Sequence, residues 1–309
     1  MASRAILEKL RGVQVTMVTP FTRDGEVDLQ AVKRGARFLV DRGISILIPN
    51  GNTGEFHSLT LDECKAVLEA TLEEVGGRAT VVGCGSYSTK TAIELGRHAQ
   101  QAGADAFMVH HPSHTFTSDE GLVEYYTRIA DALEIGVVIY KRRPDVSDEV
   151  LAKVVTHPNV VGVKYAVNDL NAFTNLVNRL PDAEVVWSCG TAERFAPFFF
   201  LGGAVAYTSG IANFAPELTL SMWRALEAGR WDEAMSIRQR ILPFEQLRAR
   251  RDSAYNVPAV KEAMRQLGLD TGVVREPITP IDPADREEVT KILAEWGITK
   301  ESVQSPKTA

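Results

Sequence analysis

One lysine stands near the end of a short apolar segment, Val160–Tyr165 (VVGVKY). A run of β-branched valines is typical of a strand that is buried on both faces in a parallel sheet. If Lys164 is held in an apolar barrel, its charged form loses hydration and its pKa falls from about 10.4 toward roughly 7–8. A neutral amine of this kind can condense with a ketone to form a Schiff base. The alternative is that the strand simply ends there and the ammonium group reaches water.

Other residues that could do chemistry lie in or just after short apolar segments that are expected to be strands, such as Val13–Phe21, Ile44–Pro49 and Ile135–Tyr140. In chain order these residues are Thr19, the loop Gly51–Glu55, His110, His111, His114, Tyr140 with Lys141–Arg143, Lys164, and Ser209–Ile211. The set contains a candidate nucleophile, an aromatic hydroxyl group, a loop of small residues and a basic cluster. It lacks the clear pair of carboxylates that glycoside hydrolysis requires.

Helical patterns alternate with these strands. Asp28 is expected to cap a helix that runs to about Asp41, and Thr60 with Glu63 forms the capping box of the next helix. Strand and helix alternate about eight times, with a repeat of roughly 25–30 residues. The sequence therefore predicts an α/β fold, a (β/α)8 TIM barrel, whose chemistry lies at the carboxyl ends of the strands. A doubly wound open sheet is the alternative, but its Gly-rich first turn is missing.

The strand pattern stops after Gly229. Three helices are predicted over Trp231–Arg251, Val257–Leu267 and Pro283–Trp296, and the chain looks frayed from about Thr299. We therefore expect a barrel with an N-terminal extension over residues 1–229 and a small C-terminal helical domain over residues 230–309.

Composition narrows the function classes. The 309 residues carry a net charge of −6, which argues against a general nucleic-acid role because phosphate binding needs a basic face. No apolar run reaches the length of a membrane span, and the N-terminus lacks a signal-peptide core. Cys64, Cys84 and Cys189 are far apart and lack zinc spacing, which is typical of reduced thiols in a cytoplasmic protein.

Several segments carry a family resemblance when they are taken together. They are GNTGEF (Gly51–Phe56), SDEGL (Ser118–Leu122), VVIY (Val137–Tyr140), VVGVK (Val160–Lys164) and the late segment GGAVAYTSGIANFAPEL. The chain resembles the dihydrodipicolinate synthase/N-acetylneuraminate lyase family of class I, Schiff-base-forming lyases. The resemblance covers nearly the whole chain, from VTPF at Val18–Phe21 to PAVKEAM at Pro258–Met264.

The resemblance implies roles for individual residues. Lys164 would form the Schiff base with a 2-oxo acid, and Tyr140 would be the nearby acid and base, although it could also be an aromatic residue of the barrel rim. The loop residues Gly51, Asn52 and Thr53 would bind the substrate carboxylate. The alternative is a tight turn, and the two roles could hold together. Two further residues, Ser209 and Gly210, would lie near the bound oxo acid, while Glu55 would hold the loop. The family also implies a homotetramer built as a dimer of dimers.

The chain departs from the synthase pattern at three places. The second tyrosine of a usual YYN sequence aligns with His114. The usual N-x-P-x-R after the catalytic tyrosine is replaced by Lys141-Arg142-Arg143-Pro144, and the usual acidic residue after the lysine is Tyr165. These changes argue against the synthase itself. Three segments are more similar to the 5-dehydro-4-deoxyglucarate dehydratase branch. They are Ala206–Ser209 (AYTS), Cys189–Glu193 (CGTAE) and Arg275–Thr279 (REPIT).

The preferred hypothesis is therefore a dehydratase that acts on a 2-oxo-3-deoxy sugar acid with two carboxylates. Arg142 and Arg143 would bind the second carboxylate, unless they form a solvated turn, and His114 would be a titratable group of the site. The alternatives are a pyruvate-dependent aldolase, a 4-hydroxy-tetrahydrodipicolinate synthase and a barrel that only senses a sugar acid. His111 and His114 have no carboxylate close by, so neither a metal nor another cofactor is expected.

Overall fold

The computed structural model describes residues 4–86, 88–112, 116–144, 146–269 and 271–304. In this part of the chain, eight strands follow one another around a closed barrel, in the order of the sequence. They are β1 (Gly12–Thr16), β2 (Ile46–Ile48), β3 (Thr80–Gly85), β4 (Ala106–Val109), β5 (Gly136–Lys141), β6 (Val160–Tyr165), β7 (Val186–Cys189) and β8 (Ala206–Ser209). The predicted (β/α)8 barrel is thereby confirmed.

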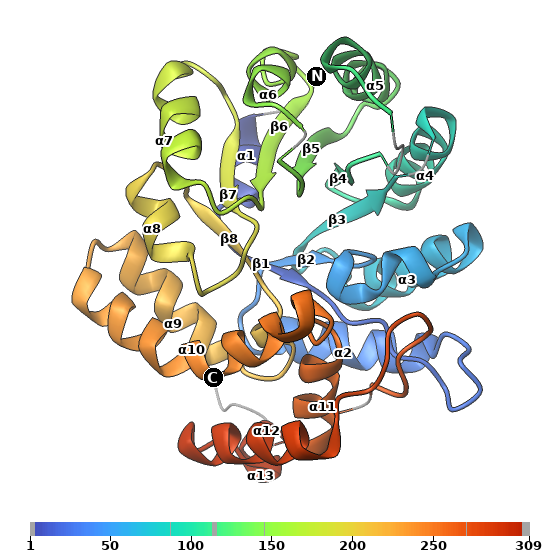
Figure 1. Ribbon diagram of the computed structural model, residues 1–309. Coiled ribbons are helices and arrows are strands. Elements are labelled where there is room, and N and C mark those ends of the chain that lie inside the picture. The colour runs from blue at the N-terminus through green and yellow to red at the C-terminus, as the bar shows by residue number, and fades with distance from the viewer. Residues whose placement is uncertain (1–3, 87, 113–115, 145, 270, 305–309) are drawn as a thin grey trace. The chain divides into compact units, whose positions relative to one another are not determined.

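The chain falls into two compact units, and the first combines Met1–Gln14 with Thr80–Thr208. Its strands β3 to β8 pair in parallel, each with the next, and the helices that follow them lie outside the strands (Figure 1). These helices are α4 (Thr89–Ala102), α5 (Asp119–Asp131), α6 (Asp148–Val154), α7 (Leu170–Arg179) and α8 (Ala196–Leu201), and α1 (Arg4–Lys9) precedes β1. All six residues of β6 are buried, as the run of valines predicted.

Side chains that accept backbone hydrogen bonds fix where most of these helices begin. Ser118 accepts from the Gly121 N–H at the start of α5, and Ser147 accepts from the Val150 N–H at the start of α6. A helix start leaves its first N–H groups without partners, so a serine there satisfies one of them. The loops that precede α5 and α6 are consequently anchored at their far ends.

The second unit combines Val15–Ala79 with Ser209–Ala309. Its helices are α2 (Leu29–Asp41), α3 (Leu61–Val75), α9 (Pro216–Glu227), α10 (Trp231–Ser253), α11 (Pro258–Gln266), α12 (Pro283–Glu295) and α13 (Lys300–Gln304), with short 3₁₀ turns η1 (Asn52–Gly54), η2 (Phe56–Ser58) and η3 (Ile211–Asn213). The Asp28 cap of α2 and the Thr60–Glu63 capping box of α3 are present as predicted. The region after β8 is helical, which confirms the predicted C-terminal helical region. The boundary at residues 229 and 230 stays a prediction.

Two local predictions were wrong. The first strand was expected to run from Val13 to Phe21, but it ends at Thr16, because the Val18 N–H donates to the side chain of Asn213 and leaves the ladder. The chain was also expected to fray from about Thr299; residues 305–309 lie outside the described part, but Lys300–Gln304 form α13. Thr299 caps it by accepting a hydrogen bond from the Ser302 N–H at 3.3 Å.

The structure also bears on membrane-spanning helices and on the three cysteines. Among the residues that the structure describes, no helix has both the length and the apolar character needed to cross a membrane. Cys64, Cys84 and Cys189 are buried, and none of them is joined in a disulfide.

Candidate active site

Lys164 and Tyr140 form a buried pair in the first unit. They are directly opposite each other in the pairing of β5 with β6. The Lys164 Nζ lies 4.2 Å from the centroid of the Tyr140 ring, and both residues are less than 5% exposed. The ring of His110, at the end of β4, meets the Tyr140 ring edge to face at 5.4 Å. The structure thus brings together the lysine and the tyrosine that the sequence placed at two strand ends.

The surroundings of Lys164 weaken its charged form. The pKa of Lys164 is lowered to about 8. Burial is the main cause, the positive charge of Arg142 acts in the same direction, and Cys84 and Cys189 act in the opposite direction. At pH 8 about half of the amine is therefore neutral. A neutral amine in an apolar site can attack a carbonyl carbon, which is the chemistry of a Schiff-base lysine.

Gly190, which directly follows β7, lies close to the Lys164 side chain. A Cβ atom at Gly190, just after β7, would lie 3.0 Å from the Lys164 Cγ and 2.7 Å from the Ala166 Cβ. The contact with Ala166 is shorter than Cβ atoms show and the contact with Lys164 is tight, so any larger residue at position 190 would have to displace these neighbours. In the sequence, Gly190 stood out only as part of CGTAE, a segment similar to the dehydratase branch. Its contact with Lys164 was not predicted.

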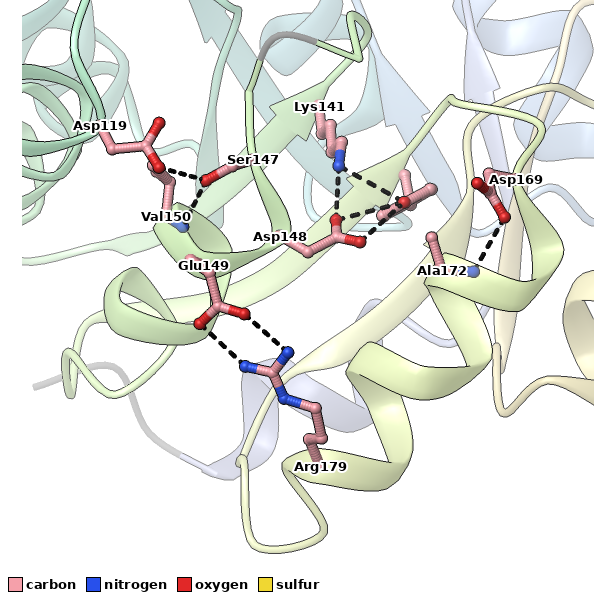
Figure 2. Close-up of polar contacts among 10 residues, drawn as sticks. Asp119, Lys141, Ser147, Asp148, Glu149, Val150, Asp169, Ala172 and Arg179 are labelled. Atoms are coloured by element: carbon pink, nitrogen blue, oxygen red, sulfur yellow. Dashed lines mark hydrogen bonds and ion pairs between the residues drawn. The ribbon is translucent and has the colours of Figure 1, made fainter.

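The second lysine at these strand ends has a different environment. The Lys141 side chain forms an ion pair with Asp148 (Figure 2). It also lies 3.4 Å from the Tyr165 hydroxyl group. Successive residues of a strand point to opposite faces, so Lys141 points away from the face that carries Tyr140. The sequence had suggested one basic cluster of Lys141, Arg142 and Arg143. Lys141 does not belong to it, because its side chain lies on the other face of the strand.

The remaining predicted residues of the first unit differ in what the structure says of them. Arg142 and Arg143 are exposed after β5, and Arg142 lies near enough to Lys164 to lower its pKa. His114 lies outside the described residues, so its predicted role stays a prediction. Within the described ranges, no three His, Cys, Asp or Glu side chains cluster as a metal site would require.

The glycine-rich loop that carries Asn52 and Thr53 is closely packed within the second unit. The Thr19 hydroxyl group donates to the Gly54 carbonyl at 2.7 Å, and a Cβ atom at Gly54 would lie 2.8 Å from the Met17 carbonyl oxygen. Gly51 packs equally closely on the side chain of Thr16. Thr53 is buried and Asn52 is half-buried in η1. The small residues are thus required by the fold of the loop itself, whatever the loop binds.

Glu55 ends this loop in a left-handed conformation, with φ 57°. Its carboxylate accepts a hydrogen bond from the Arg275 N–H at 3.0 Å and forms an ion pair of 2.6 Å with Lys261 of α11. Both members of the ion pair are almost fully buried, and the Lys261 ammonium group also lies 4.5 Å from the centroid of the Phe21 ring. These contacts support the predicted role of Glu55 in holding the loop.

We expect Lys261→Met to destabilise the protein by about 3–5 kcal/mol, because it leaves the Glu55 carboxylate buried without its partner. Urea unfolding of the purified chain measures the difference. The matched control is Lys33→Met, which breaks a more exposed ion pair with Glu73 and should cost less than about 1 kcal/mol. Equal effects of the two substitutions would contradict the prediction.

Ser209 is the last residue of β8 and Gly210 follows it, and both belong to the second unit. The Ser209 Oγ accepts a hydrogen bond from the Ala212 N–H at 2.9 Å. A Cβ atom at Gly210 would lie 2.6 Å from the Arg248 Nη2, so the buried guanidinium group of α10 lies against this glycine. The sequence reasoning missed Arg248, which forms part of a long helix with many exposed basic residues. No local pattern distinguishes it from them.

The chain resembles known proteins over almost its whole length. The sequence model of the Dihydrodipicolinate synthetase family matches residues 9–296. The chain belongs to this family. Its members are Schiff-base-forming class I lyases, and the chain is accordingly an enzyme of this class.

Relatives and solved structures agree with the family. A 4-hydroxy-tetrahydrodipicolinate synthase of Methanosphaerula palustris is 32% identical over 292 residues, which cover 92% of this chain and 99% of that protein. A probable 5-dehydro-4-deoxyglucarate dehydratase of Streptomyces griseus subsp. griseus is 31% identical, with 95% of each chain covered. The crystal structure of dihydrodipicolinate synthase from Oceanobacillus iheyensis has a TM-score of 0.93 and 40% identity, covering 95% of this chain and 99% of that one.

Proposed function

We propose that this enzyme forms a Schiff base between Lys164 and a 2-oxo acid, in the first place pyruvate, and makes or breaks a carbon–carbon bond next to the former ketone. The observation that carries the proposal is the buried Lys164 ammonium group against the Tyr140 ring, with a pKa lowered to about 8. The names of most relatives, which are 4-hydroxy-tetrahydrodipicolinate synthases, support this version over the dehydratase that the sequence favoured.

The proposed chemistry begins when the neutral Lys164 Nζ attacks the ketone carbon. The resulting carbinolamine loses water and becomes an iminium ion, which draws electrons from the neighbouring carbon and lets it release a proton. The enamine then attacks an aldehyde, and hydrolysis frees the product and the lysine. Tyr140 is proposed to move protons to and from the departing oxygen. On the family resemblance, Gly51, Asn52, Thr53, Ser209 and Gly210 are proposed to bind the oxo acid.

A dehydratase of a 2-oxo-3-deoxy sugar acid is the second candidate. The same iminium ion would release a proton from carbon 3 and hydroxide from carbon 4. Arg142 and Arg143 favour it, because two exposed guanidinium groups beside the site suit a substrate with a second carboxylate. The Streptomyces griseus relative supports it as well. His114 would then protonate the departing hydroxyl group.

Turnover assays distinguish these candidates. The purified enzyme is given pyruvate with aspartate semialdehyde or simpler aldehydes, and separately a 2-oxo-3-deoxy aldarate. The proposal expects a condensation product with pyruvate. Turnover of the aldarate alone would select the dehydratase, and an adduct without any turnover would leave the sugar-acid sensor.

A cytoplasmic homotetramer, built as a dimer of dimers, is proposed on the family resemblance.

A further inference from the structure

Lys141, Asp148 and Tyr165 form a buried polar cluster that the proposed chemistry does not use. The Lys141 ammonium group contacts the Asp148 carboxylate, and the Tyr165 hydroxyl group lies 3.2 Å and 3.4 Å from the two carboxylate oxygens. The Lys141 Nζ also lies 4.6 Å from the centroid of the Tyr165 ring. Lys141 and Tyr165 are almost fully buried, and Asp148 is half-buried. Each group of the cluster therefore contacts the other two.

The cluster occupies the position directly behind the reactive pair. In the pairing of β5 with β6, Tyr140 is opposite Lys164 and Lys141 is opposite Tyr165. Because strand side chains alternate, the first pair shares one face of the strands and the second pair the other. On that other face the Tyr165 ring packs against Phe173, with centroids 5.2 Å apart. Two departures from the synthase pattern, Lys141 and Tyr165, are thus partners in one cluster.

The ion pair also closes the base of a loop. Lys141 is the last residue of β5, and Asp148 is the first residue of α6, so their contact joins the two ends of the segment 142–147. Ser147 strengthens the far end, because its hydroxyl group donates to the Asp119 carboxylate at 2.6 Å (Figure 2). Arg142 is the first residue of this segment, and its backbone position follows directly from that of Lys141.

We propose that Lys141, Asp148 and Tyr165 are positioning residues, which hold the loop after β5 so that Arg142 faces the distal carboxylate of a substrate bound to Lys164. The inference rests on the proposed Schiff base and adds a substrate feature to it. The position of Arg142 explains a second property. A fixed positive charge near Lys164 lowers its pKa, and a loosened loop would let the guanidinium group move away from Lys164 and remove this effect.

The test is borohydride trapping of two matched 2-oxo acids. 2-Oxoglutarate carries a distal carboxylate, and 2-oxobutyrate is the same molecule without it. We expect the unaltered enzyme to be half trapped at a lower concentration of 2-oxoglutarate. Asp148→Asn should reduce this preference about tenfold, as expected for the loss of one hydrogen-bonded charge pair. It should also move the pH midpoint of trapping upward, in the same direction as Arg142→Gln.

Three further variants make the test decisive. Glu149→Gln is the matched control, because Glu149 lies in the same helical turn but pairs with the exposed Arg179, and it should change neither quantity. The double variant Arg142→Gln/Asp148→Asn should equal Arg142→Gln alone, because both act through one group. If Asp148→Asn fails to fold, Lys141→Met/Asp148→Leu replaces the ion pair by apolar groups and takes its place.

The outcomes separate the two proposals. An unaltered enzyme that gives no adduct with pyruvate would refute the proposed function. An adduct whose preference and pH midpoint are unchanged in Asp148→Asn or the apolar double variant, with only the melting temperature lowered, would overturn the inference and make the cluster purely structural.

Discussion

Replacement of Lys164 by arginine is expected to lower turnover by about 10⁴-fold or more, while the chain stays folded. A guanidinium group keeps its proton at all accessible pH values and cannot attack a ketone, so the covalent route is lost. Steady-state assays on the best substrate measure the loss, and circular dichroism measures the fold.

Controls for this substitution address its burial. Lys164→Met fills a similar volume without a charge and should be equally inactive, which excludes strain from a buried guanidinium group as the cause. Lys153→Arg, on the exposed face of α6, should retain turnover within about twofold of the unaltered enzyme. If Lys164→Arg and Lys164→Met both kept a tenth of the activity, Lys164 could not be the nucleophile.

Tyr140→Phe is expected to lower kcat by about 10²–10⁴-fold, because general acid and base groups contribute that much. The substitution keeps the ring that contacts the Lys164 Nζ and the His110 ring, so packing and KM should change little. Measurement of kcat and KM on one substrate separates the two effects. An unchanged kcat would make Tyr140 a packing residue of the barrel.

Local sequence patterns were sufficient for most of the fold and for the reactive pair. The apolar run around Lys164 predicted a doubly buried strand, and the alternation of strands with helices predicted the barrel. In such a barrel the chemistry lies at the strand ends. The predicted strand order therefore already placed Tyr140 and Lys164 on neighbouring strands. Caps such as Asp28 and Thr60 were predictable because their hydrogen bonds reach only three residues along the chain.

The parts that were missed depend on contacts between distant residues. β5 continues one residue beyond the predicted end, so Lys141 belongs to the strand and points away from Arg142's side of the loop. Its partners Asp148 and Tyr165 come from a helix and from another strand, which no local pattern connects. Arg248 beside Gly210 is a similar case, since α10 brings it there from 38 positions further along the chain.

Substrate choice was the least predictable property. The sequence favoured a dehydratase because of Arg142, Arg143 and His114. Arg142 and Arg143 follow β5 rather than belong to it, and His114 lies outside the described residues. Relatives with 30–32% identity bear both the synthase and the dehydratase names, so membership of the family does not decide the reaction.

The most direct test of the central claim is borohydride trapping with pyruvate, followed by mass spectrometry of the digested chain. The account predicts one reduced adduct, on Lys164, which forms at a rate that rises with pH through a midpoint near 8, because only the neutral amine attacks. An adduct on another lysine such as Lys141 or Lys261, or no adduct at any pH, would contradict it.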